Sequence, residues 1–83
     1  MRPPNWSSPL SRPIPMADGK FLRTLADARA LTLKNKTNRY RDAWRRAEPL
    51  IEAAANSGNP DDIARVTGQI EMVLFGQAKL DLR

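Results

Sequence analysis

The sequence predicts a small, mainly α-helical domain, and three observations support that fold class. Apolar residues recur at steps of three and four through most of the chain, which is the spacing of one helix face. Glycine, asparagine and proline gather between those segments, where helices end and begin. The 83 residues allow one thin hydrophobic core, so we expect a single domain over residues 14–83.

The clearest predicted helix covers residues 38–56, and the other elements should pack around it. Its apolar residues form one stripe: Tyr40, Ala43, Trp44, Ala47, Leu50, Ile51, Ala54 and Ala55. Trp44 is the largest side chain of that stripe, so we expect it to anchor the core. Pro49 predicts a kink or a short break, because proline removes one helical hydrogen bond.

Capping residues set the bounds of the two other predicted helices. Thr24 and Asp27 have the spacing of a capping pair, which begins a helix over residues 25–34. The Gly-Asn-Pro sequence at residues 58–60 ends one helix and begins another, over residues 60–75. The core is predicted to contain Trp44, Leu50, Ile51, Ile63, Val66, Ile70, Val73 and Leu74.

The last of these helices has one alternative interpretation. Residues 62–75 faintly resemble a helix-turn-helix motif, in which a glycine would make the turn before a recognition helix. The apolar stripe, however, continues in phase through Gly68, and the segment after it is acidic and apolar instead of basic. One uninterrupted helix is therefore the preferred interpretation.

Short β segments and a tail are predicted outside the helices. An Asp-Gly pair at residues 18–19 between apolar flanks predicts a tight turn in a hairpin near residues 14–22. Alternating apolar residues at 78–82 are typical of a strand that pairs with it. Five prolines among the first fifteen residues predict a disordered, polyproline-like tail over residues 1–13, with Trp6 as an exposed ring.

The composition argues against an enzyme. The chain has no histidine and no cysteine, so it lacks the usual general base, the thiol nucleophile and the soft metal ligands. Asp61 and Asp62 are neighbours at a helix start, where acids complement the helix dipole. We expect no catalytic residues, no cofactor and no metal.

No apolar run approaches the roughly 20 residues of a membrane span, and a cytoplasmic location is expected.

The feature with functional content is a block of positive charge. Residues 34–46 carry six positive charges and one negative charge, whereas residues 47–83 carry three positive and six negative charges. The six basic residues of the block are Lys34, Lys36, Arg39, Arg41, Arg45 and Arg46. They could grip a nucleic-acid backbone, dock an acidic protein surface, or form a solvated face that only keeps the protein in solution.

The sequence therefore supports a non-enzymatic interaction module as the preferred functional hypothesis. Its partner is expected to be a protein of unknown identity, because the catalytic groups are missing and the core is too small to enclose a substrate. The alternative hypothesis is a small nucleic-acid-binding protein that uses the basic residues of 34–46 on phosphates. No membrane partner is expected, and the oligomeric state is left open.

Several short segments carry a resemblance to known proteins. They are the DGKFLRTLADAR sequence at residues 18–29, Trp44 with its alanine-rich helix, and the Leu-Phe-Gly and Leu-Asp-Leu sequences at 74–76 and 80–82. Together they resemble a group of short bacterial proteins that has no assigned activity. The resemblance implies a self-contained bacterial domain and transfers no functional residue.

Overall fold

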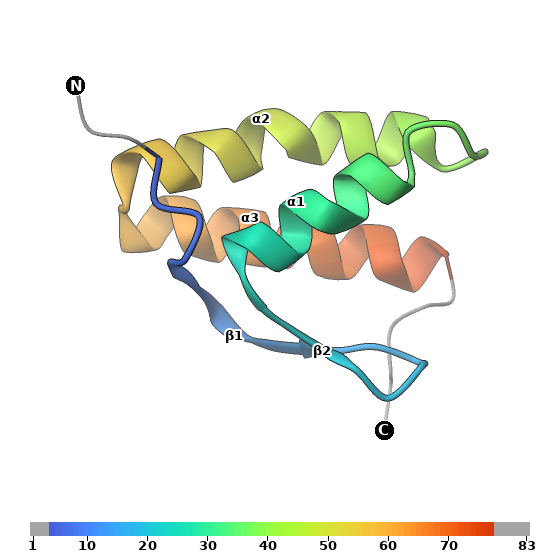
Figure 1. The fold of residues 1–83 in the computed structure, drawn as a ribbon, viewed down its shortest axis with the longest axis horizontal. Coiled ribbons are helices and arrows are strands. Elements are labelled where there is room, and N and C mark those ends of the chain that lie inside the picture. The colour runs from blue at the N-terminus through green and yellow to red at the C-terminus, as the bar shows by residue number, and fades with distance from the viewer. Residues whose placement is uncertain (1–3, 78–83) are drawn as a thin grey trace.

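The protein is a three-helix domain with a β-hairpin, as seen in a computed structural model that describes residues 4–77 (Figure 1). The elements in chain order are β1 Pro9–Pro15, β2 Phe21–Thr24, α1 Leu25–Lys34, α2 Arg41–Ser57 and α3 Pro60–Gly76. α2 and α3 lie antiparallel side by side, α1 packs on α2, and the hairpin packs on α3 through β1. The predicted fold class, mainly helical with a strand pair, is confirmed.

The helix ends follow the predicted capping chemistry. Thr24 Oγ1 accepts a hydrogen bond from the Asp27 backbone N–H, and an Asp27 carboxylate oxygen accepts from the Thr24 N–H, so α1 begins with a capping box. Asn59 caps α3, and Gly58 takes the left-handed conformation with φ of 65° at the end of α2. Because α3 continues through Gly68, the helix-turn-helix interpretation is excluded.

α2 begins later than predicted and, of the kink or short break predicted at Pro49, shows no break. It begins at Arg41 instead of residue 38, because the Asn38 side chain is used in the preceding turn, where its Oδ1 accepts from the Tyr40 N–H at 2.9 Å. Thus neither Thr37 nor Asn38 caps the helix. α2 also continues through Pro49 without a break, since eight residues on each side supply packing that keeps it helical.

The predicted hairpin turn is present. Gly19 has φ of 88°, its N–H donates to the Met16 carbonyl at 2.9 Å, and the Lys20 carbonyl accepts from the Met16 N–H at 2.8 Å. The Asp18 side chain accepts from the Lys20 N–H, as an Asx turn requires. A further strand, expected at residues 78–82 to pair with the hairpin, lies outside the described residues.

The predicted disordered tail over residues 1–13 differs from the structure, because residues 9–13 belong to β1. Prolines cannot donate to a ladder, and the pairing with β2 is irregular between Pro9 and Ile14. The strand is instead held from α3: the Thr67 hydroxyl oxygen accepts from the Ser11 N–H at 3.2 Å. Leu10 fills the core beside it, so side-chain contacts replace the missing ladder bonds.

Trp6 was expected to be an exposed ring, and the structure corrects this interpretation. Its carbonyl accepts from the Ala26 N–H at 2.8 Å, and the N–H of the neighbouring Asn5 donates to Ala55 O at 2.9 Å. The ring is partly buried against the core, with the Arg29 guanidinium 4.5 Å from its centre. The segment before β1 is therefore tied to both α1 and α2.

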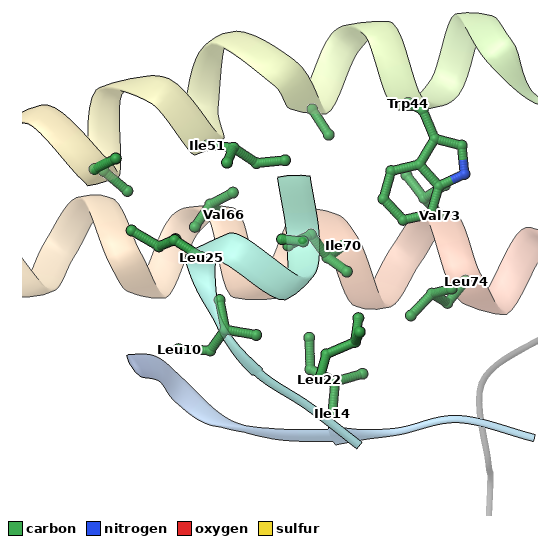
Figure 2. Packing of buried hydrophobic residues seen from close by; sticks show 14 residues of the cluster. Leu10, Ile14, Leu22, Leu25, Trp44, Ile51, Val66, Ile70, Val73 and Leu74 are labelled. Carbon is green, nitrogen blue, oxygen red and sulfur yellow. The ribbon is translucent and has the colours of Figure 1, made fainter. Parts of the chain in front are cut away.

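The hydrophobic core lies between α2, α3, α1 and the inner face of the hairpin (Figure 2). Six of the predicted core residues are buried, while Leu50 and Ile63 are partly buried at its edge. Three hairpin residues close the other side of the core and were not among the predicted core residues: Leu10, Ile14 and Leu22. Two of these residues, Leu10 and Ile14, lie in β1, whose three prolines weaken any periodic signal.

Gly68 in the middle of α3 is expected to limit the stability of the chain. A methyl group at this position would meet no atom within 4 Å, so alanine fits without a clash. Gly68→Ala should raise the free energy of unfolding by about 1 kcal/mol, because alanine loses less backbone entropy in a helix. Urea denaturation of dilute protein measures this. Gly58→Ala is the control and should lower the free energy of unfolding, because alanine is strained at φ of 65°.

Candidate functional site

The six basic residues from the sequence analysis lie at one end of the molecule, which we call the basic end. Lys34 closes α1, Lys36 and Arg39 lie in the connection between α1 and α2, and the other three lie in the first two turns of α2. That connection projects at the end opposite the α2–α3 turn (Figure 1). All six side chains are exposed, so they are accessible to a partner.

A chain of side-chain amides and one indole holds the α1–α2 connection in place. The Trp44 indole N–H donates to Gln77 Oε1 at 3.0 Å, and Gln77 Nε2 donates to Asn35 Oδ1 at 3.2 Å. Asn38 Nδ2 donates to the same Asn35 oxygen at 2.6 Å. Asn35 Nδ2 in turn donates to the Leu31 carbonyl at the end of α1. This amide network fixes the basic end to all three helices.

Three of the basic residues surround one pocket between α1 and α2. This basic pocket has a volume of about 340 Å³ and is lined by Thr32, Lys36, Arg41, Trp44, Arg45 and Glu48. Arg41 and Arg45 are four residues apart on α2 and thus share a helix face. The pocket is large enough for a phosphate group, whose charge the three cations would attract.

The remaining basic residues point elsewhere. Lys34 and Arg39 line a larger, open pocket of about 710 Å³ on the other side of the connection, together with Asp18, Tyr40 and Leu74. The Arg39 guanidinium lies 5.0 Å from the centre of the Tyr40 ring and donates to its hydroxyl oxygen.

Arg46 lines neither pocket, although it is exposed like its neighbours. It is five residues after Arg41, which places it about 140° farther around α2. The block that looks continuous in sequence is therefore divided into two pockets and one isolated side chain.

Within the part of the chain that the structure describes, no acidic side chain forms an ion pair with a cation of the basic end. Among residues 4–77, the ion pair within 4 Å is Arg12–Glu71, which joins β1 to α3. Glu48 is the acid of the basic pocket, but it lies within no such distance of a cation. The acids at the start of α3, Asp61 and Asp62, lie at the opposite end of the molecule and do not neutralise the basic end.

A neighbouring pocket involves residues that the sequence analysis did not select. It has a volume of about 150 Å³, shares Thr32, Lys36 and Glu48 with the basic pocket, and contains Trp6 and Arg29 at its far side. The Arg29–Trp6 stack could not be found from sequence, because the two residues are brought together by the hydrogen bond between Trp6 and Ala26. The two pockets are therefore neighbours along the α1–α2 junction.

In the described range no three His, Cys, Asp or Glu side chains come together as a metal site would require. Asp61 lies in the first turn of α3, and an Asp62 carboxylate oxygen accepts from the Ser57 hydroxyl at 2.6 Å, which are structural roles. No helix between residues 4 and 77 is both long enough and apolar enough to cross a bilayer. The absence of enzymatic activity stays a prediction.

Comparison of the chain with protein-family models, with curated proteins and with solved structures found no match. The resemblance to short bacterial proteins therefore stays an expectation, and functional inference depends on the site itself.

The amide network leads to a prediction about stability. Gln77→Ala should lower the free energy of unfolding by about 1–3 kcal/mol, because it leaves the indole N–H of the buried Trp44 without an acceptor. Urea denaturation followed by tryptophan fluorescence would measure the change. Gln69→Ala is the control: Gln69 lies within α3, is half-buried like Gln77, and makes no side-chain hydrogen bond in the described region, so its replacement should change stability by less than about 0.5 kcal/mol. Equal effects of the two substitutions would contradict a specific role for the network.

Proposed function

We propose that this protein is a small non-enzymatic binding module whose basic end contacts the phosphate backbone of a nucleic acid. The observation that carries the proposal is the position of the cations on α2. Arg41, Arg45 and Arg46 lie in its first two turns, with Asp42 as the one acid among them, and its last turn carries no basic residue. Opposite charge order would suit the helix dipole, whose positive end is the N-terminus.

This charge order has no benefit for the folded chain. A charge at a helix terminus interacts with the dipole by about 0.3–1 kcal/mol, and a cation at the N-terminal turn is on the unfavourable side. Arg41 and Arg45 also repel each other across one helical turn. Positions that oppose local stability without a compensating contact are those where a functional requirement is expected. An anion at the basic end would benefit from both the arginines and the helix terminus.

The arrangement suits an extended polyanion better than a single small anion. Cations line pockets on both sides of the α1–α2 connection, with Lys36, Arg41 and Arg45 on one side and Lys34 and Arg39 on the other. A nucleic-acid backbone carries phosphates at regular intervals and releases counterions when lysine and arginine replace them. Contacts of this kind determine affinity without reading sequence.

A protein of unknown identity, the partner expected from the sequence, is the competing partner, and an acidic protein surface could dock the basic block. Protein interfaces commonly have an apolar or aromatic centre that is poor in lysine. The exposed large apolar residues in the described part are Phe21, Leu33, Met72 and Phe75, and of these only Leu33 lies beside the basic pocket. The basic end thus lacks such a centre, which favours the backbone of a nucleic acid.

Adjacent arginines provide a matched test of the proposal. Arg45 lines the basic pocket and Arg46 does not, although both are exposed on α2. Arg45→Glu should weaken binding to a labelled oligonucleotide by on the order of 10-fold and make its salt dependence shallower by about one unit of log–log slope. Arg46→Glu should weaken it by roughly 3-fold or less, through long-range repulsion alone.

Fluorescence anisotropy with duplex and single-stranded oligonucleotides, at low and near-physiological salt, gives these affinities. Circular dichroism confirms that each variant is folded. Affinity that does not change with salt would overturn the proposal, as would equal losses in the two variants. If the protein binds neither oligonucleotide but binds an acidic protein in a salt-dependent way, the basic end is instead a site for a protein partner.

Glu48 supplies a test in the opposite direction. Its carboxylate lines the basic pocket and should repel a phosphate that enters. Glu48→Gln should therefore tighten oligonucleotide binding by roughly 2- to 5-fold at low salt, and the gain should shrink at high salt. Glu52→Gln is the control, since Glu52 is one turn farther along α2 and lines only the neighbouring pocket. A phosphate outside the basic pocket would leave Glu48→Gln without effect.

A further inference from the structure

The outer face of α3 carries an apolar stripe that no other part of the described chain covers. Ala64, Gly68, Met72 and Phe75 follow one another at steps of four, four and three, so they lie on one side of the helix. Met72 is 70% exposed and Phe75 is 62% exposed, the two highest values among the large apolar residues described. Methionine and phenylalanine are both enriched at protein interfaces.

Gly68 at the centre of this stripe has no purpose within the single chain. It lies inside α3 without a positive φ, so the backbone does not require glycine. A Cβ at this position would touch nothing within 4 Å, so packing inside the chain does not require it either. Glycine nonetheless weakens a helix relative to alanine. A requirement for a small residue here must come from something that approaches α3 from outside.

We propose that a second copy of this chain packs against this face, with the two α3 helices antiparallel around a twofold axis. The axis would pass midway between Gly68 and Met72, so each Met72 would lie over Gly68 of the other copy. The same register brings Phe75 of each copy over Ala64 and Arg65 of the other. Large side chains then meet small ones, and the exposed Arg65 can stack on the Phe75 ring.

The charges of the molecule favour the antiparallel orientation over the parallel one. The start of α2 and the end of α3 lie at the same end, as the Trp44–Gln77 hydrogen bond shows. The other end carries Asp61 and Asp62 at the start of α3. Antiparallel docking therefore places the acidic end of one copy beside the basic end of the other, whereas parallel docking would bring like charges together.

Arg46 is the basic residue available for this contact, because it is the one that lines neither pocket. The basic pocket opens between α1 and α2, on a different helix pair, so it stays accessible in the dimer. The inference thus does not depend on nucleic-acid binding. One helix face per copy makes a small interface, so we expect a dissociation constant on the order of 10–100 µM.

Sedimentation equilibrium of the full chain over a wide concentration range tests the proposal. The average mass should rise from that of one chain toward twice that value as the concentration passes the dissociation constant. Met72→Glu and Phe75→Glu should each weaken self-association by about 10-fold or more. Leu33→Glu is the matched control, because Leu33 is a 53% exposed apolar residue on α1, and this variant should dimerise like the parent within about 2-fold.

Gly68→Gln provides a variant whose loss of dimerisation cannot be attributed to unfolding. Glutamine forms helices better than glycine, and a Cβ at position 68 would meet nothing within 4 Å in the chain, so this variant should be at least as stable as the parent. Its longer side chain should nevertheless abolish the close approach of a second α3 and leave the protein monomeric at concentrations where the parent dimerises. A parent chain that stays monomeric throughout, or a Gly68→Gln variant that dimerises unchanged, would overturn the proposal.

Discussion

The indole N–H of Trp44 is the constraint on which the rest of the structure depends. Trp44 is buried beneath α1 and α3, and a buried indole needs an acceptor. Gln77, one residue beyond α3, provides it and passes a second hydrogen bond to Asn35, which also binds Asn38. One buried ring thereby determines where α3 ends, how α1 meets α2, and the course of the connection between them. In a chain of this size such a network represents a large share of the net stability.

The same network connects the fold to the proposed function. It holds Lys36, Arg41 and Arg45 around one pocket before any partner arrives, so less conformational entropy of the backbone is lost on binding. The arginines of α2 lie near its N-terminus, where the helix dipole is unfavourable for cations. Their position therefore lowers the stability of the helix. α3 shows a related feature in Gly68, a weak helix former in a position that the single chain leaves open. Both features lie at the surface and are the observations behind the two proposed contacts with partners.

Local sequence signals predicted the helices and the hairpin turn well, because capping and turn residues act over three or four positions. Thr24 with Asp27, Gly58 with Asn59, and Asp18 with Gly19 each specify their own neighbourhood. The predictions failed where distant contacts decide the outcome. The prolines of β1 argue against a strand, but Thr67 and the core hold it from α3. The basic residues were found from the sequence, and helical spacing alone separates Arg46 from Arg41. The pocket could not be found in this way, because it requires the packing of α1 on α2.

Mapping the contact surface by nuclear magnetic resonance tests the central claim most directly. Isotope-labelled protein would be titrated with a short oligonucleotide while the backbone amide signals are followed. The account predicts the largest changes at residues 34–45 and in the Thr32 and Glu48 signals that border the pocket, with little change at the acidic start of α3 around Asp61. Changes confined to the α3 start or the hairpin, or no changes at all, would contradict a nucleic-acid site at the basic end.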